Sequence, residues 1–438
     1  MSSSESFSGG IEAILKPPAT IGILGGGQLG RMVALEARRM GYGIAVLDPS
    51  MDCPASHLSD SFICSSFSDS AAVKDLHSRS HVLTFEFENV EPGVLDGLLS
   101  RPSFEPLYTS RNRLREKQLA RSLGIATAPF FPISSIQELE RALLDPAIEH
   151  RGGGILKTCE GGYDGKGQWR LQAGQGLSRE LKGELQAYLD SGLFAENTAG
   201  TVRPEESSQR IGGASGPHSD QGAKVEEVKN GQAAFAPLIL EGLVHFEREF
   251  SVVGTGFPDG TFAAFAPVEN EHREGILHKS KSYASLSETA RLASLDYCSQ
   301  IQKHFGYIGT FAVEFFLENG SPVFNEMAPR PHNSGHLTLD ASYSSQFEQH
   351  VRAICGLPSG DTNHHSAAVM INLIGEDDAI LDGIEEALRI PGLRFHWYGK
   401  TKSRKGRKMG HITALAKNIE EAEAKADQAY GLLRWVRQ

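Results

Sequence analysis

The sequence has little of what disulfide-stabilised, secreted or membrane-spanning proteins need. Only five of its 438 residues are cysteine, and they are spread along the chain without a Cys-x-x-Cys pair. This argues against a disulfide framework and against a structural zinc site. No apolar run approaches the ~18 residues of a membrane span, and residues 1–10 are rich in Ser, without the apolar core of a secretory signal. We therefore expect a cytoplasmic protein with no membrane partner.

The chain also lacks a long block of basic residues. It carries 43 Lys and Arg against 54 Asp and Glu, a net charge of −11, so we expect no nucleic-acid partner. What it has is glycine, with 47 residues against the roughly 7% of average composition. Such an excess is typical of backbone-lined loops that approach a ligand closely.

The chain length favours two or three domains, and the patterning divides the chain into four segments. We expect a flexible leader at 1–18, an α/β domain at 19–110, an α+β domain at 111–358 and a small C-terminal domain at 365–438. The first is predicted to be doubly wound because strands at 20–24 and 44–47 flank a helix at 30–40, with a further strand at 81–85. Residues 200–231 contain few large apolar residues and are expected to form a mobile insertion.

Further elements follow from apolar runs and their boundaries. A helix is predicted to end at Gly124, and another to span 419–433. Strands are predicted at 155–157, 237–241, 246–254, 261–268, 311–316, 322–326, 367–374 and 393–397.

The first glycine motif is ambiguous. Gly25 to Gly30 satisfies G-x-G-x-x-G between a strand and a helix, and Asp48 ends the next strand, as in a dinucleotide fingerprint. The motif predicts that backbone N–H groups at the helix N-terminus are free for an anion, without indicating which one. An NAD-dependent oxidoreductase stays open, as does a tight turn that needs glycine whatever it binds.

The second glycine-rich segment favours a polyphosphate. Lys157 ends a predicted strand, and the loop from Gly161 to Gly167 carries Lys166. It is not a P-loop, because Lys166 is followed by Gly rather than Ser or Thr. A flexible loop with lysines can close over phosphates and exclude water. The alternative is a solvated glycine hairpin.

A pair of carboxylates suggests magnesium. Glu314 and Glu326 lie in apolar strands on either side of Asn319-Gly320, a strong hairpin signal. The two residues are nearly equidistant from the turn, so they are predicted to face each other and to repel unless a cation or proton lies between them. With Asn325 and substrate phosphates they would suit Mg²⁺. A salt bridge from each Glu to a nearby Arg or Lys is the alternative.

Two polar segments follow the carboxylate pair. The Pro- and Gly-braced segment 328–336 contains Arg330, His332, Asn333 and His336, and we interpret it as a rigid polar site beside the metal. Lys400 and the basic run 404–408 could hold a phosphate monoester, although most charge runs are simply solvated.

Taken in order, these motifs resemble the ATP-grasp family. The resemblance covers about residues 20–435 and rests on GGGQLGR, FEFENV, GGYDGKGQ, PVENEH, APRPHNSGH and GRKMGH. Two of them, GGYDGKGQ and APRPHNSGH, are similar to those of the branch that carboxylates an aminoimidazole ribonucleotide in purine biosynthesis. The resemblance implies an N-terminal preATP-grasp domain, a central ATP-grasp domain and a small C-terminal domain.

The resemblance also implies a reaction and its components. ATP would convert bicarbonate to carboxyphosphate, and 5-aminoimidazole ribonucleotide would be carboxylated, leaving ADP and phosphate. Mg²⁺ would be the cofactor, and the protein would be a homodimer.

Site residues are assigned by the same resemblance, residue by residue. ATP would contact Arg113, Lys157, Gly162, Tyr163, Asp164, Gly165, Lys166, Gly167, Gln168, Glu241, Gly242, Leu243, Val244, Glu249, His272, Asn325 and Glu326. The catalytic residues around bicarbonate would be Lys166, Arg330, His332 and Asn333. The ribonucleotide would contact Gln28, Leu29, Glu86, Tyr163, Asp164, Lys400, Arg407 and Lys408, and the metal would be held by Glu314 and Glu326.

Four other functions are alternatives. A formate-dependent glycinamide ribonucleotide transformylase or a biotin carboxylase would share the ATP-grasp fold, but the two specific motifs argue against both. An NAD-dependent oxidoreductase would rest on the first glycine motif and Asp48 alone. A non-catalytic nucleotide-binding protein would need a broken carboxylate pair, and the pair is intact.

Overall fold

The computed structural model describes residues 14–91, 93–161, 167–191 and 236–437. The expected insertion at 200–231, most of the expected leader and Gly162 to Lys166 lie outside the described residues. Among the described helices, none combines the length and the hydropathy that crossing a bilayer requires.

The N-terminal sheet confirms the predicted doubly wound start. Its four parallel strands run in the order β3-β2-β1-β4, and its apolar strands are covered on both faces, as parallel strands usually are. The elements are β1 (Thr20–Leu24), α1 (Gln28–Arg39), β2 (Gly43–Asp48), η1 (Ser56–Leu58), β3 (Ser61–Cys64), α2 (Ser70–Ser78) and β4 (Val82–Phe85).

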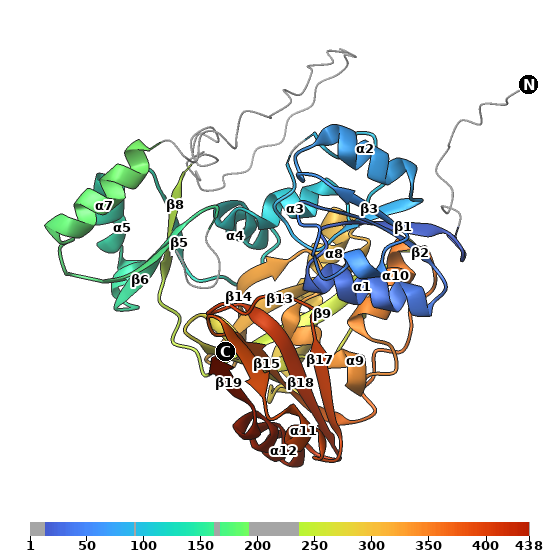
Figure 1. The fold of residues 1–438 in the computed structure, drawn as a ribbon. Helices are drawn as coiled ribbons and strands as arrows, with labels where there is room; N and C mark the ends of the chain where they lie inside the picture. Colours follow the sequence, from blue (N-terminus) through green and yellow to red (C-terminus); the bar gives the residue numbers. More distant parts are fainter. Residues whose placement is uncertain (1–13, 92, 162–166, 192–235, 438) are drawn as a thin grey trace, which may run out of the picture.

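A small antiparallel sheet forms a separate lobe, at the left of Figure 1. Its order is β5-β8-β6-β7, and α5 and α7 pack on it through a cluster of buried Leu and Ile. Two helices lead into the lobe: α3 (Phe104–Ser110), which packs in the core of the N-terminal domain, and α4 (Arg113–Ser122). The elements of the lobe itself are β5 (Phe130–Ile133), α5 (Ile136–Leu143), α6 (Pro146–Glu149), β6 (Gly153–Thr158), β7 (Gln168–Gln172), α7 (Arg179–Asp190) and β8 (Leu238–Gly242).

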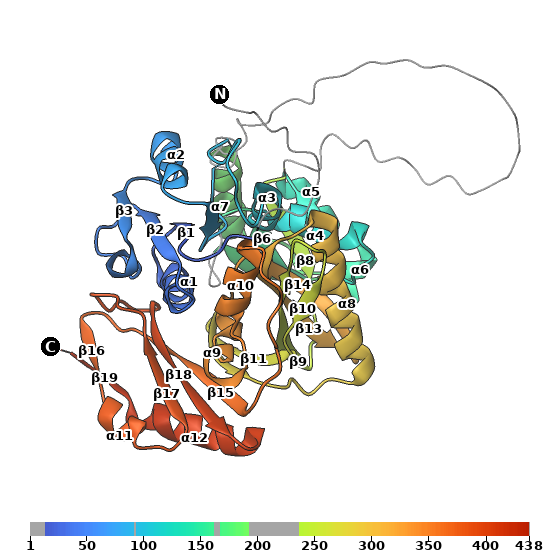
Figure 2. The same ribbon diagram turned by 90° about the vertical axis from the view of Figure 1, so that its right-hand side faces the viewer.

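One large sheet runs through the rest of the molecule in the order β14-β13-β9-β11-β12-β15-β18-β17, with β10 paired to β9. Its strands are β9 (Arg248–Gly256), β10 (Phe262–Ala264), β11 (Val268–Arg273), β12 (Ile276–Lys281), β13 (Gly309–Glu318), β14 (Ser321–Ala328), β15 (Ala367–Ile374), β17 (Leu393–Trp397) and β18 (Lys408–Ala416). Since β12 pairs with β15, the expected C-terminal domain extends the central sheet (Figure 2).

The remaining elements cover this large sheet or lie at its edges. They are α8 (Glu288–Phe305), η4 (Asn333–Gly335), α9 (Thr338–Ala341), α10 (Gln346–Ile354), β16 (Ala379–Asp382), α11 (Ile384–Leu388), α12 (Ile419–Leu432) and β19 (Arg434–Arg437).

The predicted strand at 261–268 is wrong. The chain forms β10, leaves the sheet after Ala264 and re-enters at Val268 as β11, and both segments pair with β9. Pro267 lies in the break. A proline cannot donate to a ladder of backbone hydrogen bonds, so it is disfavoured inside a central strand.

The β13–β14 hairpin is confirmed. Glu318 pairs with Ser321 across a two-residue turn in which Asn319 and Gly320 have φ of 51° and 72°. Positive φ at both central positions identifies the turn type whose twist suits a hairpin and explains the Asn-Gly sequence. From this turn the strands pair in register as far as Phe315 and Phe324, and a one-residue shift beyond them places Glu314 opposite Glu326.

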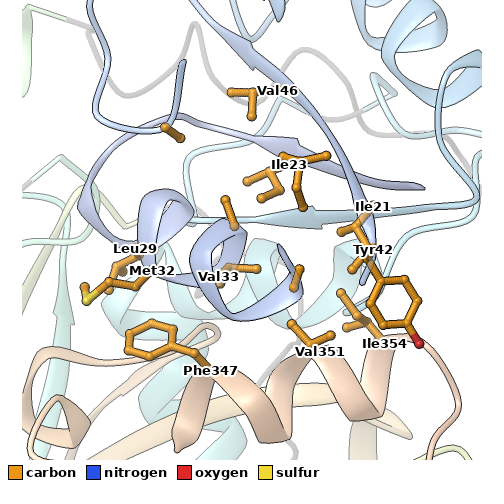
Figure 3. Packing of buried hydrophobic residues seen from close by; sticks show 14 of the residues in the cluster. Ile21, Ile23, Leu29, Met32, Val33, Tyr42, Val46, Phe347, Val351 and Ile354 are labelled. Atoms are coloured by element: carbon orange, nitrogen blue, oxygen red, sulfur yellow. The ribbon is translucent and has the colours of Figure 1, made fainter. Parts of the chain in front are cut away.

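The N-terminal sheet is locked to the large sheet through α10. Figure 3 shows α1 packed on α10, with Leu29, Met32 and Val33 facing Phe347 and Val351. A cluster of this kind excludes water from the whole contact, so the two domains share one core.

A buried histidine adds a polar link at the same junction. His350 Nδ1 accepts from the N–H of Thr310 at 3.0 Å, and its Nε2 lies 2.7 Å from Thr84 Oγ1. Since Nδ1 is an acceptor, Nε2 carries the proton and donates to Thr84. Burial lowers the pKa of His350 to about 3, so the folded protein keeps this ring neutral.

This histidine predicts acid sensitivity. The unfolded chain protonates a histidine near pH 6.5, whereas folded His350 resists protonation down to about pH 3. The unfolded state therefore binds more protons in this range, and stability falls as the pH drops below about 6.5, by up to ~1.4 kcal/mol per pH unit. Urea unfolding midpoints at pH 7.5, 6 and 5 measure this loss.

The matched variants are His350→Gln and the exposed His57→Gln. In His350→Gln we expect stability to fall less steeply with decreasing pH, by up to ~1.4 kcal/mol per pH unit less than in the wild type. In His57→Gln we expect the pH dependence of stability to be unchanged. An unaltered acid dependence in His350→Gln would contradict the assignment.

Candidate active site

The first glycine loop is occupied by the protein's own carboxylates. Glu86, directly after β4, accepts from the N–H of Gly27 and from the N–H of Gly30 at 2.9 Å. Asp48 Oδ2 accepts from the N–H of Gly26 at 2.8 Å, and its Oδ1 accepts from the N–H of Ser50. The N–H groups of Gly26, Gly27 and Gly30 are therefore not free for an anion, and the prediction is wrong for these three. Asp48, the acidic residue on which the dinucleotide interpretation depends, instead fixes the loop through Gly26 and Ser50.

Glycine is required in this loop by close contact. A Cβ at Gly27 would come 2.3 Å from Glu86 Oε1, and one at Gly26 would come 2.2 Å from Cys53 Sγ. This close approach places the Glu86 carboxylate at the start of α1. The N–H groups of Gln28 and Leu29 lie in the first turn of the helix, where no backbone acceptor within the helix is available to them.

The carboxylate pair lies on β13 and β14, at one end of the large sheet. Glu314 is held opposite Glu326 in register, and burial, together with the negative charge of Glu326, raises the pKa of Glu314 to about 7. The predicted alternative of a salt bridge to Arg or Lys is not what Glu314 makes. Its ion-pair contact is His332 Nε2, 3.3 Å from Glu314 Oε1. The pair is thus short of compensating positive charge.

A β-bulge brings a third oxygen donor to the same place. The register between β13 and β14 shifts after Glu314, so that Asn325 and Glu326 together oppose Glu314. A bulge re-aims a side chain, which allows two consecutive residues to serve one site.

This donor set fits Mg²⁺. Within the described residues, no cluster of three or more His, Cys, Asp or Glu side chains is placed to hold a metal ion. Mg²⁺ usually takes one or two protein carboxylates and completes its shell with water and substrate phosphate. Glu314 and Glu326, which face each other across the hairpin, can supply these carboxylates.

The segment after β14 turns toward the pair. Arg330 forms an ion pair with Glu88 at 2.8 Å. Burial, followed by the charge of Arg330, keeps the pKa of His332 well below its usual value, so its ring is neutral. Asn333 is 6% exposed, and neither end of its amide has a hydrogen-bond partner in the described structure. A buried amide with both ends unsatisfied is costly unless a ligand meets it.

Glu249 and His272 form a second contact on this face of the sheet. His272 Nδ1 lies 2.6 Å from Glu249 Oε2. Burial lowers the pKa of His272, but the hydrogen bond to Glu249 and the nearby charges of Glu314 and Glu326 raise it overall. The predicted ATP residues Glu249 and His272 are thus brought together and lie within the field of the carboxylate pair.

A buried ion triad joins α4 to the small lobe. The Glu241 carboxylate lies 3.0 Å from Lys117 Nζ and 3.0 Å from Lys157 Nζ. Burial raises the pKa of Glu241, but the two lysines outweigh it and lower the value to about 2. Lys157, predicted to meet phosphates, is in this structure the partner of Glu241.

The basic residues near the C-terminus meet the start of α1 around a cavity of about 900 Å³. Lys400 Nζ donates to Gln28 Oε1 and, at 2.6 Å, to the carbonyl of Lys408. Burial, followed by the charge of Arg407, lowers the pKa of Lys400 to about 8. Gln28, Lys400, Arg407 and Lys408, far apart in the sequence, all line this cavity.

The remaining assigned residues divide into two groups. Gly162, Tyr163, Asp164, Gly165 and Lys166 lie outside the described residues. The others lie near the small lobe. Arg113 Nη1 donates to the carbonyl of Thr158, and the N–H of Leu243, which lies between Gly242 and Val244, donates to the carbonyl of Gly153. Gln168, which follows Gly167, pairs with Lys157 across β6 and β7.

Sequence reasoning missed three charged residues. Glu88 holds Arg330. Lys117 is 2% exposed and donates to the carbonyl of Phe324 as well as pairing with Glu241. Glu116 accepts from the N–H of Met327, and burial followed by the charge of Glu326 raises the pKa of Glu116 well above its usual value. A possible signal was the run Glu116-Lys117 inside an otherwise amphipathic helix.

Comparison with known proteins gives three domain matches. Residues 18–109 match a ribonucleotide synthetase preATP-grasp domain, 218–347 an ATP-grasp domain and 368–425 a phosphoribosylaminoimidazole carboxylase C-terminal domain.

Whole-chain relatives agree with these matches. N5-carboxyaminoimidazole ribonucleotide synthase of Brucella melitensis biotype 1 is 38% identical over 92% of this chain and 97% of its own length. A crystal structure of an ADP complex of N5-carboxyaminoimidazole ribonucleotide synthetase has a TM-score of 0.78, with 34% identity over 96% and 98% of the two chains. An Aspergillus clavatus enzyme, solved with ADP and 5-aminoimidazole ribonucleotide, has a TM-score of 0.73 and 26% identity over 94% and 98%.

The ion triad predicts a large stability effect. Glu241→Gln keeps the side-chain shape but leaves two buried lysines without their shared carboxylate, which costs about 3–5 kcal/mol when a buried ion pair is broken. Glu140→Gln is the matched control, because Glu140 and its partner Lys182 are 43% and 42% exposed. Such surface pairs contribute about 1 kcal/mol or less. Equal losses in the two variants, measured by urea unfolding, would refute the triad.

Proposed function

The chain belongs to the family of N5-carboxyaminoimidazole ribonucleotide synthases, and from this premise we propose which of its residues bind each substrate. It is an ATP-grasp ligase of purine biosynthesis that uses ATP to carboxylate 5-aminoimidazole ribonucleotide. The observation that carries the residue assignment is the facing pair of carboxylates, Glu314 and Glu326, followed a few residues later by the buried amide of Asn333, which has no partner among the described residues.

ATP is proposed to bind between the small lobe and the large sheet. Lys157 and Arg113, both at the β6 side of this lobe, would neutralise phosphate charge. Glu241 to Val244 would contact the adenine, and Glu249 the ribose. Phosphoryl transfer needs charge neutralisation and alignment more than covalent help, so a Lys held ready by Glu241 suits the task. Gly162 to Gln168 would close over the phosphates.

Mg²⁺ is proposed to be held by Glu314 and Glu326, with Asn325 as a further oxygen donor. When bound, it would neutralise charge on the transferred phosphoryl group. Without a cation the two carboxylates face each other, and burial of Glu314 together with the charge of Glu326 raises the pKa of Glu314 to about 7.

Bicarbonate, and the carboxyphosphate formed from it, are proposed to lie against Arg330, His332, Asn333 and Lys166. Asn333 offers a donor and an acceptor, and neither has a protein partner. Arg330 is oriented by Glu88 and brings the cationic charge that an oxyanion needs. Carboxyphosphate decomposes in water, so the burial of these groups has a chemical purpose.

The ribonucleotide is proposed to span from the first glycine loop to the C-terminal cations. Its phosphate would meet Lys400, Arg407 and Lys408 in the cavity that they share with Gln28. Its base would approach Glu86, and Leu29, Tyr163 and Asp164 complete the assigned contacts. Glu86 thus has two tasks, since it also holds the loop.

A homodimer and a cytoplasmic location are also proposed, on the family resemblance alone. Light scattering on the full chain tests the first, and a mass near twice 47.5 kDa is expected.

Phosphate release from Mg-ATP in bicarbonate buffer tests the function. We expect release that requires both 5-aminoimidazole ribonucleotide and Mg²⁺. Glu326→Gln should reduce it by about a hundredfold or more, since it removes a metal ligand. Glu288→Gln, an exposed carboxylate on α8, should leave it unchanged. Release that needs a different amine or acid would retain the fold and discard the substrate, and normal turnover in Glu326→Gln would overturn the metal assignment.

Lys400→Ala predicts a selective binding defect. Loss of one charge-assisted contact to phosphate is worth about 1.5–3 kcal/mol, or about 10- to 100-fold in the KM for the ribonucleotide. The KM for ATP should change little. Lys405→Ala, exposed on the same basic run, separates a specific contact from the general positive field. If both variants raise the ribonucleotide KM equally, Lys400 makes no special contact.

A further inference from the structure

The ring of His332 ends a row of buried hydrogen bonds that the proposed substrate contacts do not use. Its Nδ1 accepts from the N–H of Ser334 at 3.3 Å and lies 2.9 Å from Ser334 Oγ. Ser251 Oγ in turn donates to Ser334 Oγ at 2.7 Å. Both serines are fully buried.

The row continues across three neighbouring strands. Asn270 Nδ2 on β11 donates to Ser251 Oγ on β9 at 3.0 Å, and Ser280 Oγ on β12 donates to Asn270 Oδ1 at 2.9 Å. A side-chain amide has one donor end and one acceptor end. Asn270 therefore gives the row a direction, with each hydrogen pointing toward His332.

This direction determines where the proton of the His332 ring sits. A hydroxyl has one hydrogen, and Ser334 Oγ already accepts from Ser251, so its own hydrogen is available to His332 Nδ1. The Ser334 N–H points at the same nitrogen. In a neutral ring, Nδ1 is then the acceptor and Nε2 carries the proton. That Nε2 lies 3.3 Å from Glu314 Oε1.

The backbone of His332 is fixed separately. Gln346 Oε1 accepts from the His332 N–H at 2.9 Å, and Gln346 Nε2 donates to the His332 carbonyl at 2.7 Å. Gly335 leaves the room for this contact, because a Cβ there would come 2.6 Å from Gln346 Oε1. A change in the row of hydroxyls can therefore alter the ring without moving the loop.

We propose that Ser334, Ser251, Asn270 and Ser280 are positioning residues that hold His332 in the tautomer with its proton on Nε2, so that an N–H donor faces the bicarbonate site. That a bicarbonate or carboxyphosphate oxygen accepts from the Nε2 N–H rests on the proposed function, whereas the tautomer itself does not. A fixed N–H donor stabilises negative charge that develops on a carbonate or phosphate oxygen. The other tautomer would turn a lone pair toward that charge.

Asn270→Asp tests the direction of the row with an almost isosteric change. A carboxylate only accepts, so Ser251 would donate to it, Ser334 would donate to Ser251, and His332 Nδ1 would have to supply the last hydrogen. We measure the ring ¹⁵N shifts of the full chain labelled at histidine, without substrates, and assign His332 by difference with His332→Gln.

The wild type should show a protonated Nε2 and an unprotonated Nδ1, and Asn270→Asp should move proton population to Nδ1. Ser251→Ala interrupts the row and should move it in the same direction by a smaller amount, which keeps the test available if the first variant does not fold. A wild-type ring protonated on Nδ1, or a tautomer unchanged in the folded variants, would overturn the proposal.

Kinetics separate positioning from general damage. Ser251→Ala should lower kcat by about 10- to 100-fold, the usual effect of losing an outer hydrogen bond to a site residue, with both KM values nearly unchanged. Ser294→Ala is the matched control, because Ser294 is also fully buried but donates to the Arg291 carbonyl on α8. If kcat does not fall while the tautomer shifts, the row sets the proton without serving catalysis, and that half of the proposal fails. A tautomer result without any carboxylation would instead count against the proposed function alone.

Discussion

Two carboxylates held opposite each other on neighbouring strands are the constraint around which this molecule is built. The Asn319-Gly320 turn and the one-residue register shift after Phe324 together place Glu314 opposite Glu326. On the other face of β13, Val313 and Phe315 are buried in the core under α8. A slip by one residue would exchange the two faces and bury the carboxylates in that core. The apolar packing of one face therefore maintains an electrostatically unfavourable arrangement on the other, which a bound cation can relieve.

The surroundings of the pair are polar but highly ordered. Glu241 is enclosed by two lysines, Arg330 is held by Glu88, and His332 is held by Ser334 and Gln346. Buried ions of this kind contribute little to stability relative to apolar residues of the same size. What they provide is orientation, because each group has only one arrangement that satisfies its partners. Asn333 is the exception, because neither end of its buried amide has a partner among the described residues.

Much of this fold could be predicted from local pattern. Strands at 20–24, 367–374 and 393–397 coincide with β1, β15 and β17, because each is a short apolar run bounded by Gly, Pro or polar residues. The hairpin turn followed from its residues, but the register shift that brings Glu326 opposite Glu314 did not. By contrast, the break between β10 and β11 depends on Pro267 in an otherwise strand-like run, and its effect was underestimated.

The site was predictable in composition but not in its internal contacts. The carboxylate pair and the polar segment after it are adjacent in sequence, so a motif identifies them. The capture of the Gly27 and Gly30 amides by Glu86, and the pairing of Lys117 with Glu241, join residues 56 or more positions apart. The sequence around Gly27 does not indicate that Glu86 accepts from its N–H, and the sequence around Lys117 does not indicate that Glu241 neutralises its charge. Only the closed chain topology brings these partners together.

The continuous pairing from β14 to β17 has a mechanical consequence. The carboxylate hairpin and β18, the strand that begins at Lys408, belong to one network of backbone hydrogen bonds, so the distance between them is fixed by the sheet. Groups that this sheet carries therefore keep a constant spacing. The sheet of the small lobe, β5 to β8, is not part of this network, so the position of the lobe is not fixed by the same backbone hydrogen bonds.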